Sequence, residues 1–355
     1  ALGTDEAYQE AVLQQVEARN ARLGADRFIA GTRWPGATGE PTQVTWSIVP
    51  DGTGEIQPAP GTLQTPGVSD LFFRLNQQFG DPTGQFWISM IQDAFQADPT
   101  GIETNETRGV LHDWGNISGL TFTQVVKPPD LSDPENPNYF DWDSGATWNE
   151  TGSANGNLMP PGGLPSDPDV GDIRIAGKRI DGFGGVVAYA YGPGDPLFPG
   201  EIVLDTQEEW SKPDFQFRFF KNSIVRMIGF AIGLEQVCPE LKKRIMEKFD
   251  NFGFTGPQDD DIRGVQSLYG DYLEQDDDPT SGTLIQVDLG ALVGQLFAHD
   301  YRSLDSINDM DYYIINFPDP GDVIDYDLTV RVVPIGETYQ NGAANNGGCG
   351  GVSTT

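Results

Sequence analysis

The stretch 223–237, SIVRMIGFAIGLEQV, constrains the fold of this chain more than any other segment. Its apolar side chains occur at the density of a helix that is buried inside a domain: Ile224, Val225, Met227, Ile228, Phe230, Ala231, Ile232 and Leu234. Gly233 stands where such a helix would end, because glycine readily adopts the backbone conformation that closes a helix. We therefore predict a central helix around which the rest of the domain packs.

The chain has 355 residues, which is enough for two domains with their own cores. Its 53 acidic and 21 basic side chains give a net charge of −32. This charge argues strongly against a nucleic-acid partner, because such binding depends on Lys and Arg neutralising phosphates. It favours a salty or extracellular setting, or a surface partly neutralised by divalent cations.

Location and cysteine chemistry follow from simpler features. No apolar run approaches the roughly 20 residues of a membrane span, no signal peptide is visible, and the first residue is Ala1, as in a mature product after cleavage. We therefore expect a secreted protein, extracellular or at the cell surface. The two cysteines, Cys238 and Cys349, could form one disulfide, bond to other chains or stay free. With two His in the chain, a three-His metal site is impossible within one copy.

The periodicity along the chain predicts five parts. Residues 1–30 form a helical segment whose apolar stripe would dock on its own domain or on a partner chain. Residues 31–273 form the main domain, with strands predicted at 43–50, 171–175, 186–191 and 201–204, and a further strand that follows a helix end within 114–126. Helices are predicted at 69–79, 85–96, 223–237 and 261–268. The acidic run 259–261 would cap the last of these helices.

The C-terminal part is predicted to be a separate small unit. Residues 274–282 are a polar, acidic linker. Residues 283–340 carry short strands at 284–287, 312–317, 327–333 and 338–339, which are too few for a full β-sandwich. Either this domain is small, or another chain adds the missing strands. Residues 341–355 form a Gly-rich tail.

Five motifs follow one another within the main domain: GDIRIAGKRIDGFGGVVAYAYGP, LDTQEEW, SIVRMIGFAIGLEQV, RIMEKF and DIRGVQSLYG. In this order they resemble the motifs of the matrixins, which are metzincin zinc endopeptidases, and most of all the bacterial secreted forms. The resemblance implies an α+β metzincin-like domain, with a twisted, mostly parallel sheet, an antiparallel edge strand and helices. A small or incomplete all-β sandwich domain would follow it. The resemblance also places Met246 beneath the zinc position.

The zinc-binding residues of that family are replaced in this chain. Its signature, H-E-x-x-H-x-x-G-x-x-H, falls on residues 226–236. The three His positions hold Arg226, Phe230 and Gln236, and the general-base position holds Met227. Arginine and phenylalanine offer no usable lone pair, glutamine offers only a hard amide oxygen, and methionine cannot accept a proton from water. We therefore expect no catalytic residues and no catalytic zinc.

The structural zinc site of the family is also degenerate, because Tyr189 and Val203 occupy two of its His positions. These side chains provide no metal-binding nitrogen. The resemblance therefore implies a chain that has lost both zinc sites.

The calcium loop of the family is retained. Residues 181–186, DGFGGV, match its D-G-x-G-x-V motif, in which an Asp side chain and three backbone carbonyls bind Ca²⁺. The corresponding ligands here are Asp181, Gly182, Gly184 and Val186, and two further carboxylates match: Asp205 and Glu208. Hard oxygen ligands of this kind are those that calcium prefers. Without the resemblance, the same motif is simply a turn whose glycines can adopt positive φ.

These features predict a secreted, catalytically inactive matrixin-like protein that is stabilised by Ca²⁺ and acts in binding or self-assembly. The predicted edge strand Val186–Tyr191 would bind another copy of the chain or an extracellular peptide. Repeated head-to-tail contacts would give rings or filaments. Two alternatives remain open: a metalloendopeptidase-family hydrolase with an unrecognised active site, and a monomeric extracellular binding protein.

Overall fold

The computed structural model describes residues 30–59, 65–96, 113–125, 148, 170–214, 216–237, 244–247, 253–272, 283–286, 312–316, 344–345 and 348–349. The predicted helix within residues 1–30, the linker 274–282 and most of the Gly-rich tail lie outside these ranges. So do Cys238 and the strands predicted at 327–333 and 338–339.

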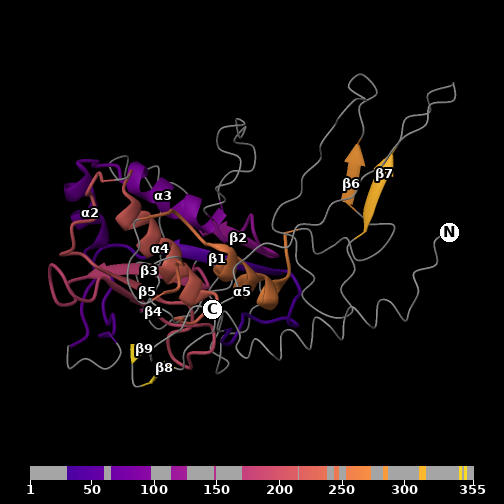
Figure 1. The fold of residues 1–355 in the computed structure, drawn as a ribbon. Coiled ribbons are helices and arrows are strands. Elements are labelled where there is room, and N and C mark those ends of the chain that lie inside the picture. Colours follow the sequence, from indigo (N-terminus) through magenta and orange to yellow (C-terminus); the bar gives the residue numbers. More distant parts are fainter. Residues whose placement is uncertain are drawn as a thin grey trace, which may run out of the picture.

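A five-stranded sheet organises the main domain (Figure 1). Its strands, in the order β2-β1-β3-β5-β4, are β1 (Thr42–Ile48), β2 (Leu120–Gln124), β3 (Ile173–Lys178), β4 (Ala188–Ala190) and β5 (Ile202–Asp205). The first four strands of this order pair in parallel, and β4 pairs antiparallel with β5 at the edge. The predicted mostly parallel sheet with an antiparallel edge strand is therefore confirmed.

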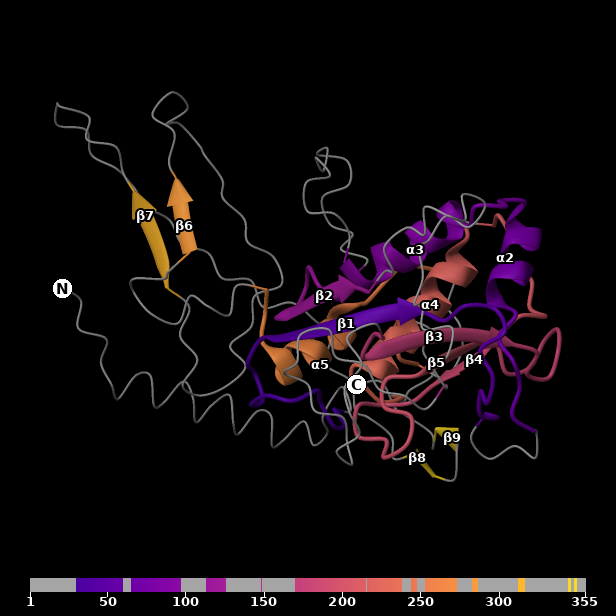
Figure 2. The same ribbon diagram turned by 180° about the vertical axis from the view of Figure 1, so that it is seen from behind.

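Four helices accompany the sheet, as seen from behind in Figure 2: α2 (Leu71–Phe79), α3 (Gln85–Gln96), α4 (Arg218–Ala231) and α5 (Asp259–Tyr269). Helix α4 packs against α3 and against strands β4 and β5. The limits of α3 are the predicted ones, and α2 begins two residues later than predicted. The acidic run 259–261 forms the first turn of α5 rather than preceding it, because Gln258 is the N-cap of a capping box with Asp261.

The central helix occupies different limits from those predicted. It begins at Arg218, after Phe217 has adopted a left-handed backbone with φ 62°, and it ends at Ala231. The apolar residues beyond Ala231 are buried in a turn and in an isolated β-bridge between Ala30 and Leu234. A run of apolar side chains indicates burial, and it cannot separate a buried helix from the buried turn that follows it.

The hydrophobic core lies on both faces of the sheet. One cluster joins the helices to the sheet and includes Trp46, whose ring stacks on Phe95 at 4.3 Å between centroids. A second, smaller cluster contains Val49, Ile56, Ala59, Trp148, Ala176, Ile180, Tyr189 and Val203. Strand β1 is buried at every position except Gln43, as expected for a parallel strand covered on both faces.

The C-terminal strands that the structure describes form two pairs. Strands β6 (Thr283–Gln286) and β7 (Tyr313–Asn316) pair in parallel and lie apart from the large sheet (Figure 1). Strands β8 (Ala344–Asn345) and β9 (Gly348–Cys349) pair antiparallel. Strands were predicted at the positions of β6 and β7, whereas the all-β sandwich domain stays a prediction. None of the helices in the described part of the chain has the length and apolar character required to span a bilayer.

Candidate functional site

Arg226 contacts the other two residues at the His positions of the zinc signature. Arg226 and Phe230 lie one turn apart on the same face of α4, and the guanidinium of Arg226 sits over the Phe230 ring at 5.5 Å from its centroid. The Arg226 Nη2 donates a hydrogen bond to the Gln236 Oε1 at 3.3 Å. We call this group the α4 triad. The fold therefore brings together the three positions that the signature predicts to be neighbours.

The turn after α4 depends on Gly233. Its φ is +98°, and a Cβ at this position would lie 2.3 Å from the carbonyl oxygen of Thr32. The Gly31 N–H donates a 2.7 Å hydrogen bond to the Gly233 carbonyl, which fixes the turn against the neighbouring segment. Only glycine meets both the conformational and the steric requirement. This turn returns the chain toward α4 and so places Gln236 beside Arg226.

Met246 packs against α4 from the side of Gly229. A Cβ on Gly229 would lie 2.5 Å from the Met246 sulfur, so a glycine is needed for this close approach. The Met246 carbonyl accepts a hydrogen bond from the Val237 N–H at 3.0 Å. The Asp261 carboxylate accepts the backbone N–H groups of Ile245 and Met246 at 2.9 and 3.2 Å. Burial raises the pKa of Asp261 to about 7.

The side chains at the positions of the zinc signature on and after α4 can pack and carry charge, but they lack the usual zinc-binding groups. Arg226 is 9% exposed and Met227 4% exposed, while Phe230 is half-buried and Gln236 is exposed. These side chains provide no imidazole, thiolate or carboxylate, which are the donors used at catalytic zinc sites. The arrangement can hold a fixed positive charge against an aromatic face.

Strand β4 borders this site and is shorter than the predicted strand Val186–Tyr191. Hydrogen bonds from the Asp205 N–H to the Val187 carbonyl and from the Tyr191 N–H to the Glu201 carbonyl set its antiparallel register with β5. In this register the backbone N–H and C=O groups of Ala188 and Ala190 point away from β5. Among the described residues, β4 is the last strand at this side of the sheet.

Tyr189 and Val203, the two residues at structural-zinc positions, stand directly opposite each other on β4 and β5. Both are buried in the smaller core cluster beside Trp148. The Tyr189 hydroxyl donates a hydrogen bond to the Gln57 carbonyl, and burial raises the pKa of this hydroxyl. An apolar cluster therefore surrounds the positions at which the family has metal-binding His.

The structure brings the three predicted calcium-binding carboxylates to the loop 181–186. Asp205 Oδ2 accepts the N–H groups of Asp181 and Gly182, both at 3.0 Å. Glu208 Oε1 accepts the Gly184 N–H at 2.8 Å, and Asp181 Oδ2 accepts the Val186 N–H at 3.1 Å. We call residues 181–186 the acidic loop and residues 205–208 the acid turn.

The donor set of the acidic loop and the acid turn suits calcium, because it combines carboxylates with backbone carbonyls. Gly182 and Gly184 adopt positive φ of 94° and 73°, as the predicted turn requires. In the residues that the structure describes, no three His, Cys, Asp or Glu side chains are grouped as metal ligands. Instead, the carboxylates close the loop by accepting its N–H groups, and a bound cation would share or replace these bonds.

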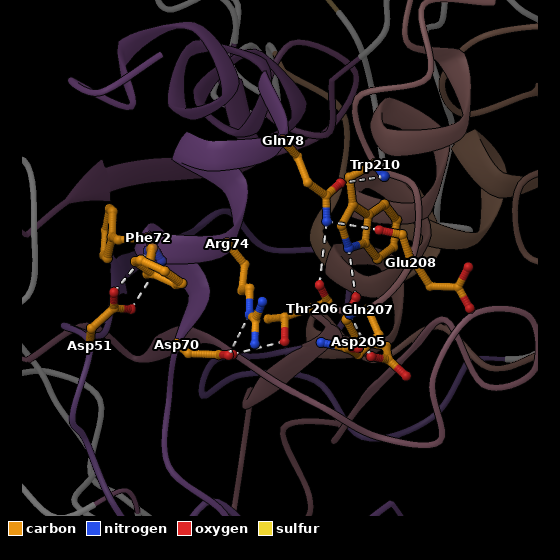
Figure 3. A network of polar contacts seen from close by, with 11 residues as sticks. Asp51, Asp70, Phe72, Arg74, Gln78, Asp205, Thr206, Gln207, Glu208 and Trp210 are labelled. Atoms are coloured by element: carbon orange, nitrogen blue, oxygen red, sulfur yellow. Dashed lines mark hydrogen bonds and ion pairs between the residues drawn. The ribbon is translucent and has the colours of Figure 1, made fainter. Parts of the chain in front are cut away.

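Helix α2 and its N-cap residue contribute contacts that no sequence motif predicts. Gln78 and Asp70 hydrogen-bond to the acid turn (Figure 3). Polar residues in and beside an amphipathic helix are ordinary surface features, so no motif marks these two as part of a site.

Comparison with known proteins finds matrixin similarity in the part of the chain that contains the α4 triad, the acidic loop and the acid turn. Residues 172–270 match the family model described as Matrixin. The chain is 40% identical over 96 residues to macrophage metalloelastase of Oryctolagus cuniculus, which is 26% of this chain and 19% of that protein. It is 37% identical over 99 residues to matrix metalloproteinase-15 of Homo sapiens, which is 26% of this chain and 14% of that protein. The chain thus spans less than a fifth of the length of either relative.

Proposed function

We propose that this chain, whose residues 172–270 match the matrixin family model, is a secreted, catalytically inactive matrixin that binds other copies of itself or an extracellular peptide. The α4 triad carries the proposal. A zinc-dependent hydrolase needs neutral ligands for the metal and a base for the water. Arg226 supplies a permanent cation where the first ligand would lie, and the buried Met227 supplies no base.

The binding role is supported by the edge strand. Ala188 and Ala190 present backbone donors and acceptors away from β5, and an added strand would pair with such groups. The Phe230 carbonyl oxygen would lie 3.6 Å from a Cβ on Gly192, just beyond β4, so the α4 triad adjoins this edge. A peptide held there would meet a charged and aromatic surface rather than a reactive metal.

We assign the stabilising cation to the acidic loop and acid turn. Asp181, Asp205 and Glu208 would hold Ca²⁺ together with the carbonyls of Gly182, Gly184 and Val186. Calcium would neutralise carboxylates in a chain whose net charge is −32. It would also stiffen the loop that leads directly into β4.

Loss of catalysis is tested by assaying the purified full chain on fluorogenic peptides with and without a chelator, together with elemental analysis for zinc. We expect neither cleavage nor stoichiometric zinc. Chelator-sensitive cleavage by the pure protein would instead identify a metalloendopeptidase-family hydrolase with an unrecognised site.

Edge-strand binding is tested by sedimentation velocity of the chain and of Ala190→Pro, with Ala190→Ser as the matched control. Proline removes an N–H that points away from β5, so the sheet keeps its pairing and only the added strand loses a donor. We expect self-association of the wild type and the serine control, and weaker association of the proline variant. Monomers alone, with and without calcium, would favour the monomeric binding protein.

Calcium binding is tested by titration calorimetry and thermal unfolding of the wild type and Asp205→Ala. We expect calcium to raise the unfolding midpoint of the wild type and to have a much smaller effect on the variant. Equal midpoints with and without calcium in both proteins would remove the cation from the proposal.

A further inference from the structure

Helix α2 lies outside the segment 172–270 that matches the family, yet it holds the acid turn. The Gln78 Nε2 donates to the carbonyl oxygens of Thr206 at 3.3 Å and Glu208 at 2.9 Å. The Gln78 Oε1 accepts the backbone N–H of Trp210 at 2.9 Å. One side chain of α2 therefore satisfies three backbone groups in and beside the acid turn (Figure 3).

A second contact from the start of α2 fixes the same turn. The Asp70 Oδ1 accepts a 2.8 Å hydrogen bond from the Thr206 hydroxyl, and the Asp70 Oδ2 accepts the Arg74 Nε at 2.9 Å. From the other side, the buried Trp210 donates its indole N–H to the Asp205 carbonyl at 2.7 Å. The backbone of the acid turn is thus held at both of its ends.

These contacts leave the two carboxylates of the turn aimed at the acidic loop. Asp205 is fully buried and Glu208 is 4% exposed, and both accept loop N–H groups. Carboxylates held by a fixed backbone are pre-organised, because little motion remains to be lost when a ligand binds. The Asp205 N–H also donates to the Val187 carbonyl at 2.8 Å, so the turn fixes the entry to β4 as well.

We propose that Gln78 is a positioning residue that sets the carboxylates of Asp205 and Glu208 on the acidic loop and thereby sets the affinity of the loop for calcium. The affinity part rests on the calcium site assigned under the proposed function, whereas the positioning part stands on the contacts of Gln78 alone. Within the described part of the chain, the Gln78 side chain bonds to backbone groups of the turn and its flank, so it acts through the residues that it orients. Partners of this kind alter metal affinity by roughly 10- to 100-fold when removed.

The test compares Gln78→Met with Gln77→Met in the full chain. Methionine matches glutamine in length and cannot replace its hydrogen bonds. Gln77 is the neighbouring, exposed residue of the same helix, so its substitution controls for the change of residue type. Calcium affinity is measured by calorimetry on chelator-treated protein at a temperature at which both variants are folded. We expect affinity to fall roughly 10-fold or more for Gln78→Met and to stay unchanged for Gln77→Met.

Hydrogen exchange of the Gly184 and Gly182 amides, in the absence of calcium, tests the positioning separately. These amides donate to Glu208 and Asp205, so we expect faster exchange in Gln78→Met and wild-type exchange in Gln77→Met. If Gln78→Met does not fold, Thr206→Val replaces it, because valine removes only the hydroxyl bond to Asp70 and should give a smaller change in the same direction.

The outcomes separate the two proposals. Calcium binding of equal strength in wild type and Gln78→Met would overturn the affinity part of this inference and leave the calcium site in place. A wild-type chain that binds no calcium would overturn the calcium site, and with it the affinity part of this inference. The exchange rates would then decide the positioning part: unchanged rates in Gln78→Met would overturn it, and faster rates would support it.

Discussion

The α4 triad and the acidic loop differ in how much of the matrixin motif pattern each contains. At α4 the backbone arrangement is present: a helix places residues 226 and 230 on one face, Gly233 turns the chain, and Met246 packs against Gly229. The metal-binding side chains are absent. At the acidic loop both the glycine-rich backbone and the carboxylates are present. In this chain, the backbone arrangement of a site and the metal-binding side chains on it can therefore be present independently of each other.

The positions that correspond to the structural zinc site of the family show a third arrangement. Tyr189 and Val203 are enclosed by apolar neighbours, whereas Arg226 and Gln236 keep polar contacts beside an open strand edge. Where buried polar or charged groups serve only to stabilise the fold, well-packed apolar side chains can take their place. If β4 binds a ligand as proposed, the residues beside it determine what that ligand meets.

The strongest test of this comparison is to return the missing ligands to α4. We expect the variant combining Arg226→His, Met227→Glu, Phe230→His and Gln236→His to bind about one zinc ion per chain, since Gly233 and the turn already bring these positions together. Atomic absorption after gel filtration measures the gain, and Met227→Glu alone is the control that lacks the three His ligands. A folded quadruple variant that retains no zinc would show that the framework is not preserved.

A second test contrasts one glycine from each region. Gly233 and Gly182 have similar φ of +98° and +94°, but a Cβ on Gly233 would meet the Thr32 carbonyl at 2.3 Å and a Cβ on Gly182 would meet nothing within 4 Å. We expect Gly233→Ala to lower the free energy of unfolding by more than about 3 kcal/mol, and Gly182→Ala by about 1–2 kcal/mol from backbone strain alone. Urea unfolding measures both, and equal losses would mean that the turn after α4 is not sterically constrained.

The fold of the main domain could be predicted from the sequence where the signal was local. The apolar pattern located α3 at its observed limits and β1 within two residues. It placed α4 several residues too far toward the C-terminus, because Ile232 and Leu234 are as buried as the helix itself. Their burial arises from contacts distant in sequence, such as the bridge between Ala30 and Leu234, which periodicity does not encode.

The site could be predicted only where a motif carried it. The spacing of Arg226, Phe230 and Gln236 with Gly233 between them was enough to predict that they would be neighbours. Gln78 and Asp70 could not be found in this way, because their role arises from the packing of α2 beside a turn more than 120 residues away in sequence. Calcium binding, secretion and self-assembly stay predictions.

A third test concerns the support beneath the α4 framework. Burial raises the pKa of Asp261 from 3.8 to about 7 in the fold. Between these two values the folded state therefore binds more protons than the unfolded state. The contribution of Asp261 to stability is then greatest at low pH, falls as pH rises from about 4 to 7, and is constant above 7.

We expect Asp261→Asn to remove this part of the pH dependence, which amounts to at most about 1.4 kcal/mol per pH unit. Urea unfolding from pH 4 to 8 measures it. Asp172 serves as an internal comparison, because burial raises its pKa to about 6 and its contribution has the same sign in both proteins. Identical slopes in wild type and variant would show that Asp261 titrates normally, which would mean that the backbone N–H bonds from Ile245 and Met246 offset the effect of burial on its pKa.

The smallest expected effect is the coupling within the α4 triad itself. The bond from Arg226 to Gln236 is 3.3 Å long and ends on an exposed side chain, so solvent competes for it. A double-mutant cycle of Arg226→Met and Gln236→Leu should give a coupling free energy of about 0.5 kcal/mol. A coupling above about 2 kcal/mol would mean that the triad replaces zinc as a structural support. In that case the backbone arrangement at α4 would depend on the side chains of Arg226 and Gln236. The backbone arrangement and the identity of the side chains would then not be independent at α4.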